Sequence, residues 1–122
     1  MTPFLFLAVS LAGGLGACAR FILDGLIRAK ANYPTPWGTF IINISGSFLL
    51  GYLTGVASQS LLPPTWLPIV GTGFLGGYTT FSTASVETAR LLTEEKRLAA
   101  TVSGVGTLLG ATAAAAAGLW LA

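Results

Sequence analysis

Four long apolar segments constrain this chain more than any other feature of its sequence. They run approximately over residues 3–23, 37–58, 66–86 and 98–121. Each holds about 20 residues, the length that an α-helix needs to cross a hydrocarbon core of about 30 Å. Only 8% of the 122 residues are charged, against about a quarter in soluble domains. We therefore predict an all-α integral membrane protein, with one four-span membrane domain over residues 1–122.

The third segment contains a stretch that a regular helix tolerates poorly. Residues 76–83 read Gly-Gly-Tyr-Thr-Thr-Phe-Ser-Thr, and both adjacent glycines and β-branched threonines lower helix stability. Backbone released from helical hydrogen bonds is expensive in hydrocarbon unless protein, water or an ion satisfies it. We therefore predict that the third helix is broken at membrane depth, and that the break is an ion site.

The basic residues are placed unevenly along the chain. All six lie near the connection between the first and second segments or between the third and fourth: Arg20, Arg28, Lys30, Arg90, Lys96 and Arg97. These connections share one side of the membrane. The positive-inside rule assigns that side to the cytoplasm and both termini to the outside of the cell (inner) membrane. We interpret Arg20 as a topology and interface residue that pairs with Asp24, four residues on, at the membrane boundary.

The membrane interior is poor in ionisable groups. No Asp, Glu, Lys, Arg or His lies between Ala31 and Val86 or after Arg97. Proton-coupled transporters usually hold such a residue at depth, so the sequence argues against a small multidrug antiporter and favours passive ion movement. The charges are too few for a nucleic-acid footprint. We see no buried nucleophile or acid–base pair, and we predict that the protein is not an enzyme.

The second segment carries a narrow stripe of polar and small residues. Thr39, Asn43, Ser47, Gly51 and Gly55 recur every four residues, so they share one face of a helix. Gly51 and Gly55 favour close helix packing, and so do two other glycine pairs with the same four-residue spacing, at 73 and 77 and at 106 and 110. An unpaired Asn43 amide in hydrocarbon would be costly. The residues alone leave two interpretations open: a hydrogen bond that holds the helices together, or an ion path.

Phe81 favours the ion path. It lies among hydroxyl residues inside the broken segment, and the edge of an aromatic ring carries partial positive charge. Such an edge attracts an anion more weakly than a formal charge does, and conduction requires binding weak enough for the ion to leave. Amide and hydroxyl donors beside a ring edge therefore predict a path for a small, strongly hydrated anion.

At this point three motifs resemble those of a known family. Residues 37–51, from Trp37-Gly-Thr-Phe-Ile-Ile-Asn43 to Gly51, are similar to the second-span signature of the CrcB/Fluc fluoride channels. Gly73-Phe-Leu-Gly76-Gly77-Tyr-Thr79-Thr80-Phe81-Ser82-Thr83 resembles their third-span signature. Gly13-Gly14-Leu-Gly16-Ala-Cys-Ala-Arg20 resembles their first-span motif. The similarity extends over nearly the whole chain.

The resemblance implies a passive fluoride channel that exports fluoride from the cytoplasm. It also implies an antiparallel dimer with two pores and a structural sodium ion. Asn43 would bind the permeating fluoride, and Phe81 would present its ring edge to it. The backbone carbonyls of Gly76 and Thr79 would ligate the sodium. The remaining expected pore residues are Thr39, Ser47, Thr80, Ser82, Ser103 and Thr107.

The chain departs from the family at Ala84, where the family usually has a second phenylalanine. The missing ring leaves open an altered pore, a ring supplied by a partner subunit, or an engineered substitution. A chain that inserts both ways should have little bias in its basic residues. We therefore expect one orientation and pairing with an oppositely oriented homologue, with a homodimer as the alternative. The alternative function is a non-conducting accessory subunit.

Overall fold

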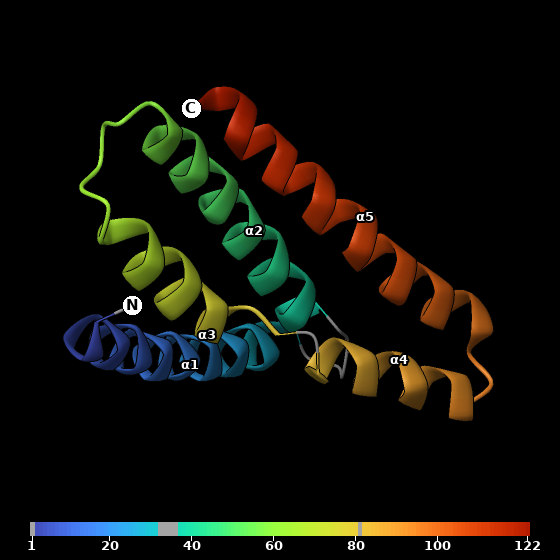
Figure 1. Cartoon of the computed structure of the whole chain (residues 1–122). Coiled ribbons are helices and arrows are strands. Elements are labelled where there is room, and N and C mark those ends of the chain that lie inside the picture. Colours follow the sequence, from blue (N-terminus) through green and yellow to red (C-terminus); the bar gives the residue numbers. More distant parts are fainter. Residues whose placement is uncertain (1, 32–36, 81) are drawn as a thin grey trace.

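The computed structural model describes residues 2–31, 37–80 and 82–122, and these residues form helices joined by short connections (Figure 1). The elements are α1 (Pro3–Ala31), α2 (Trp37–Ser58), the π-helix η1 (Leu67–Leu75), α3 (Gly76–Tyr78), α4 (Ser82–Thr93) and α5 (Arg97–Leu121). No strand occurs among the described residues. The predicted all-α class is therefore confirmed.

Three unbroken helical stretches of the described chain are long and apolar enough to cross a membrane. They are Pro3–Ile27 within α1, Gly38–Ser58 within α2, and Arg97–Leu121, which is α5. The second and fourth predicted segments coincide with helices to within a residue at each end. The first helix continues to Ala31, beyond its expected end at residue 23. The third predicted segment is divided among η1, α3 and the start of α4.

The predicted break in the third segment is confirmed. The helix winds as a π-helix through Leu75, continues as α3 to Tyr78, and then stops because Thr79 is extended, with φ −80° and ψ 159°. Helical winding resumes at Ser82. π-Helical winding is rare, and it usually occurs as short bulges in α-helices, frequently at functional sites. Figure 1 shows α4 leaving the break in a new direction, away from α2.

The helices alternate in direction between two ends of the bundle (Figure 1). Both termini and the connection between α2 and η1 lie at one end, and the turn between α4 and α5 lies at the other. The C-terminal end of α1 and the N-terminal end of α2 also lie toward that second end. The helix ends that carry the basic residues of the described chain therefore lie toward the same end of the bundle.

Glycines allow α1 to lie directly against the third segment. A Cβ atom on Gly77 would overlap the Gly13 carbonyl, and one on Gly16 would overlap the Phe74 carbonyl. Because backbone atoms cannot move aside as a side chain can, these positions require the smallest residue. This seam fixes how α1 lies along η1 and α3.

A second glycine seam joins α2 to α5. Gly51 lies against the Ala115 backbone, and Gly118 lies against the Phe48 backbone. The expected packing role is thus confirmed for Gly51, as it is for Gly77 in the first seam. Gly106 differs, because a Cβ there would meet nothing within 4 Å.

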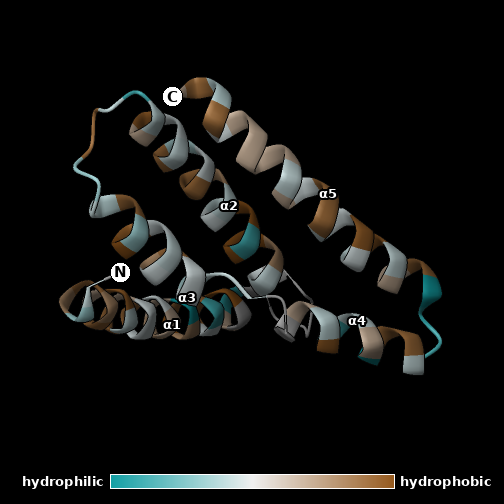
Figure 2. Ribbon diagram, viewed as in Figure 1, coloured by the Kyte–Doolittle hydropathy of each residue, from teal (hydrophilic) through white to brown (hydrophobic). Residues whose placement is uncertain are grey.

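Large apolar side chains lie mostly on the outside of the bundle. Phe21 is 81% exposed and Trp120 is 84% exposed, whereas Ile42 is 1% exposed. Figure 2 shows many hydrophobic residues along α1 and α5, and hydrophilic residues at the turn between α4 and α5, on α2 and toward the C-terminal end of α1. An apolar exterior is the arrangement expected of helices surrounded by lipid.

Candidate functional site

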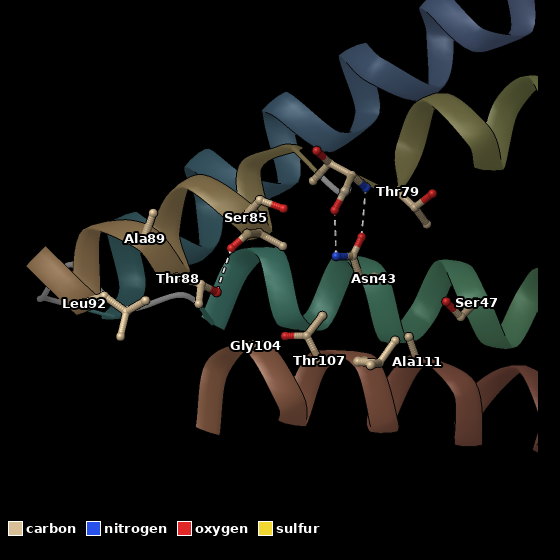
Figure 3. A pocket seen from close by; sticks show the side chains of 13 residues that line it. Asn43, Ser47, Thr79, Ser85, Thr88, Ala89, Leu92, Gly104, Thr107 and Ala111 are labelled. Carbon is tan, nitrogen blue, oxygen red and sulfur yellow. Dashed lines mark hydrogen bonds between the residues drawn. The ribbon is translucent and has the colours of Figure 1, made fainter. Parts of the chain in front are cut away.

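A groove of about 580 Å³ lies where α2, the break, α4 and α5 meet (Figure 3). Its lining consists of Asn43, Ser47, Thr79, Thr80, Ala84, Ser85, Thr88, Ala89, Leu92, Gly104, Thr107, Leu108 and Ala111. None of these described lining residues carries a formal charge. An ion in the groove would therefore interact with dipoles of amides, hydroxyls and backbone groups.

Asn43 connects α2 to the break. Its side chain is 8% exposed. Nδ2 donates to the Thr80 carbonyl at 2.9 Å, and Oδ1 accepts from the Thr80 amide at 2.8 Å (Figure 3). The side-chain amide thus pairs with both backbone groups of one residue, much as a neighbouring strand would. Because Nδ2 carries two hydrogens, one N–H remains beyond this pair, and Asn43 lines the groove.

The carbonyls at the end of α3 obtain donors from several sources. The Leu75 carbonyl accepts from the Thr79 amide at 2.9 Å and from Thr79 Oγ1 at 3.0 Å. The Gly77 carbonyl accepts from Arg20 Nε at 3.3 Å. In a continuing helix the Thr80 amide would donate to the Gly76 carbonyl, but here it donates to Asn43. The break therefore diverts the regular helical donor from Gly76.

Gly76 and Thr79, the expected sodium ligands, flank the point where the helix stops. Gly76 is exposed in the single chain, and Thr79 is half-buried. The described residues contain no group of three or more His, Cys, Asp or Glu side chains that could hold a metal. Carbonyl oxygens are suitable ligands for a hard cation. The donor chemistry at the break therefore fits a sodium ion better than a transition metal.

The hydroxyls of the groove fall into two kinds. Thr79 donates its O–H to the Leu75 carbonyl, and Thr88 donates its O–H to the Ala84 carbonyl at 2.9 Å. A hydroxyl has only one hydrogen to donate, so these two present lone pairs to the groove.

The hydroxyls of Ser47, Ser85 and Thr107 make no hydrogen bond within the part of the chain that the structure describes. Each therefore keeps an O–H that can donate to a ligand. They come from α2, α4 and α5 respectively and line one groove with Asn43 (Figure 3). The arrangement can surround an anion with neutral donors from three helices.

The structure brings together four of the expected pore residues: Asn43, Ser47, Thr80 and Thr107. Thr39 is only 4% exposed, and its hydroxyl donates to Glu87 Oε1 at 3.0 Å. Neither Thr39 nor the half-buried Ser103 is among the residues that line the groove. Phe81 lies outside the described residues, as does the side chain of Ser82.

Two groove residues of α4 were missed by the sequence interpretation. Ser85 and Thr88 are three residues apart, so they share a face of α4. Ser85 lies inside the predicted third segment and Thr88 lies two residues beyond its end. Both follow the break, and helical spacing continued from Ser82 identifies the face that they share.

Two charged residues are also placed differently from the sequence interpretation. Glu87, one residue beyond the predicted third segment, is half-buried and accepts from Thr39. Arg20, expected to pair with Asp24 at the membrane boundary, makes a contact that the sequence interpretation did not include. It is inside the stretch Pro3–Ile27 and donates to the backbone at the break. Both residues are ionisable groups within the packed part of the bundle.

Gly46 allows the break to lie directly on α2. A Cβ atom at this position would overlap Thr79 Cγ2 and crowd the Tyr78 ring. Beside it, the Tyr78 hydroxyl and Ser45 Oγ are 3.0 Å apart and share a hydrogen bond. The last residues of α3 are therefore held against the same face of α2 that carries Asn43.

Comparison with known proteins identifies one family model and relatives that are named as fluoride-specific ion channels. Residues 7–119 match the family model described as CrcB-like protein, Camphor Resistance (CrcB). The chain is 54% identical over 121 residues to a protein of Leifsonia xyli subsp. xyli named "Fluoride-specific ion channel FluC 1". That match covers 99% of this chain and 88% of the relative.

Two further relatives carry similar names. "Fluoride-specific ion channel FluC 2" of Cutibacterium acnes is 56% identical over 88 residues, covering 67% of this chain and 68% of the relative. A protein of the same name from Mycobacterium tuberculosis (strain H37Rv) is 38% identical over 122 residues, covering 100% and 94%. The similarity therefore includes all the elements that build the groove.

Proposed function

This chain belongs to the CrcB family, and we propose that it is a passive, fluoride-selective channel through which fluoride leaves the cytoplasm. It is a membrane channel and not an enzyme. Hydrogen fluoride enters a cell uncharged and dissociates inside, and the trapped anion then leaves through the channel. The membrane potential favours exit, by about 2.3 kcal/mol per elementary charge for each 100 mV.

The observation that supports this proposal most strongly is the donor arrangement around Asn43. One N–H of Asn43 is bonded to Thr80, and the second would replace part of the hydration shell of fluoride. The hydroxyls of Ser47, Ser85 and Thr107 line the same groove and would supply further donors. Because no described lining residue is charged, the anion would be attracted weakly enough to leave again. Phe81 would add the positive edge of its ring.

We further propose that the Gly76 and Thr79 carbonyls hold a structural sodium ion. The extended conformation of Thr79 and the diverted Thr80 amide support this. Bound sodium would supply positive charge at the break and stabilise its carbonyls. Gly76 and Thr79 would hold the ion in place, while the Asn43 side chain is hydrogen-bonded to the backbone of the next residue, Thr80.

For the assembly, we propose an antiparallel dimer with both termini outside the cytoplasm. The basic residues near both connections at one end of the bundle support a fixed orientation, and hence an oppositely oriented homologue as the partner. Ala84 lines the groove where the family usually has a phenylalanine. The partner subunit would supply the aromatic ring that this chain lacks.

The pore assignment is tested by fluoride efflux from proteoliposomes, followed with a fluoride electrode. We expect Asn43→Asp to abolish the flux, because a carboxylate repels the anion and offers it no donor. We expect Phe81→Ile to abolish it as well, through loss of the ring edge. The dimer should still form in both variants, as judged by size-exclusion chromatography. Wild-type flux from both variants would refute the assignment.

A non-conducting accessory subunit is the alternative, and Ala84 favours it because the groove lacks a ring there. Reconstitution of this chain alone, with its homologue, and as Ala84→Phe separates the two functions. A channel subunit requires flux that depends on Asn43 of this chain when the homologue is present. An accessory subunit predicts that Asn43→Asp leaves the flux of the mixed preparation unchanged.

A further inference from the structure

Arg20 lies where a cation is costly unless it has a partner. The stretch Pro3–Ile27 is apolar enough to span a membrane, and Arg20 lies within it and is half-buried. Its Nε donates to the carbonyl of Gly77 at 3.3 Å. Intramembrane charges usually serve a function and pair with backbone carbonyls or other charges. A role in orientation alone would not require this contact with another helix.

The Gly77 carbonyl lies at the C-terminal end of a helix, where backbone carbonyls commonly take donors from outside the helix. Gly77 lies in the last turn of α3, which ends at Tyr78, and Thr79 is extended. Carbonyls at a helix C-terminus carry partial negative charge, and cations are favourable there. A guanidinium N–H is a charge-assisted donor, which makes a stronger hydrogen bond than a neutral group. Arg20 thus supplies a charge-assisted donor to a carbonyl at the C-terminal end of α3.

The register of this contact is set by the glycine seam. Gly13, Gly16 and Arg20 are spaced by three and four residues, so they lie on one face of α1. Gly13 contacts the backbone of Gly77, and Gly16 contacts the backbone of Phe74. Close approach of the two backbones brings the guanidinium within reach of the carbonyl end of α3.

We propose that Arg20 is a positioning residue that ends the third-segment helix at the break. By donating a hydrogen bond to the Gly77 carbonyl, Arg20 stabilises the end of α3. In this geometry Thr80 pairs with Asn43, and the Gly76 carbonyl is available to a cation. Arg20 acts on fluoride passage without contacting fluoride. The inference deepens the proposed function, since it concerns the same break.

The test compares Arg20→Met, which keeps the length of the side chain but removes the donor, with Arg20→Lys, which keeps the charge. Arg90→Gln is the control, because Arg90 is exposed on α4. The first readout is hydrogen–deuterium exchange at the Thr79 and Thr80 amides, measured without fluoride. Losing a donor to the half-buried Gly77 carbonyl should speed this exchange by about tenfold in Arg20→Met. We expect Arg20→Lys to recover part of the protection and Arg90→Gln to match wild type.

The second readout is the sodium dependence of fluoride efflux. A role in positioning predicts that Arg20→Met needs more sodium for half-maximal flux, with partial rescue by Arg20→Lys. A purely structural role would lower the flux equally at all sodium concentrations, and that result would overturn the inference. Unchanged exchange at Thr79 and Thr80 in Arg20→Met would overturn it as well. Exchange is measured without fluoride, so faster exchange with no fluoride flux in any preparation would support the positioning role while refuting the proposed function.

Discussion

At the scale of single residues, a hydroxyl can donate to an ion in the groove only if its hydrogen is not already bonded to the backbone of its own helix. Thr107 keeps its O–H for the groove, whereas Thr112 on the same helix donates to the Leu108 carbonyl at 2.8 Å and is exposed on the outside. The sequence predicts that both threonines lie on the fourth helix, but it does not show which of the two hydroxyls donates to the backbone of that helix. That choice depends on the rotamer, which packing decides.

This difference supplies a matched pair of substitutions. Thr107→Val removes an O–H from the groove with little change in shape, so we expect fluoride efflux to fall by about tenfold, as for a lost hydrogen bond of ordinary strength. Thr112→Val removes a hydroxyl that faces away from the groove and should leave the flux within twofold of wild type, an estimate of about 0.4 kcal/mol. Equal loss in both variants would show that the groove hydroxyls do not contact the ion.

Asn43 and Arg20 show how far the sequence could predict the site. The cost of an unpaired amide in hydrocarbon identifies Asn43 as important, and the structure shows it paired with Thr80. The link from Arg20 to Gly77 spans 57 positions in sequence and leaves no local signal. Ser85 could have been found from helical spacing, since it follows the break by a single turn.

At the scale of elements, helix positions follow from the sequence where apolar runs are continuous. The ends of α2 and α5 agree with the predicted segments because hydropathy and helix length decide them. The π-helical winding of η1 was not predicted, since hydropathy and residue spacing do not distinguish it from an α-helix. The break was predicted from the glycines at 76 and 77 and from the threonines that follow, and the helix stops at the first of those threonines, Thr79, whereas both glycines are helical. The sequence does not show that the Thr80 amide pairs with Asn43.

The glycine seam gives a prediction at this scale. Gly77→Ala places a methyl group against the Gly13 backbone, so α1 and α3 must separate, and we expect a loss of about 1–3 kcal/mol in stability. Gly14→Ala is the control, because a Cβ there meets nothing within 4 Å and alanine favours the helix. Thermal unfolding in detergent measures both. A Gly77→Ala variant as stable as Gly14→Ala would contradict the close packing.

At the scale of the whole molecule, the distribution of charge determines how the chain inserts. The basic residues all lie near the connection between the first and second segments or between the third and fourth. The positive-inside rule requires such a one-sided distribution for a fixed orientation. Expression of the chain alone with a terminal reporter should therefore show both termini outside the cytoplasm. Both orientations, together with robust fluoride flux from this chain only, would exclude the mixed dimer.

The central claim is that neutral donors beside Asn43 carry fluoride through the groove. Its most direct test is efflux of fluoride and of chloride from liposomes that contain this chain, alone and together with its oppositely oriented homologue. The account predicts fluoride release in a conducting preparation, retention of chloride, and loss of the fluoride signal on Asn43→Asp. Equal release of both anions, or fluoride release that Asn43→Asp does not change, would contradict it.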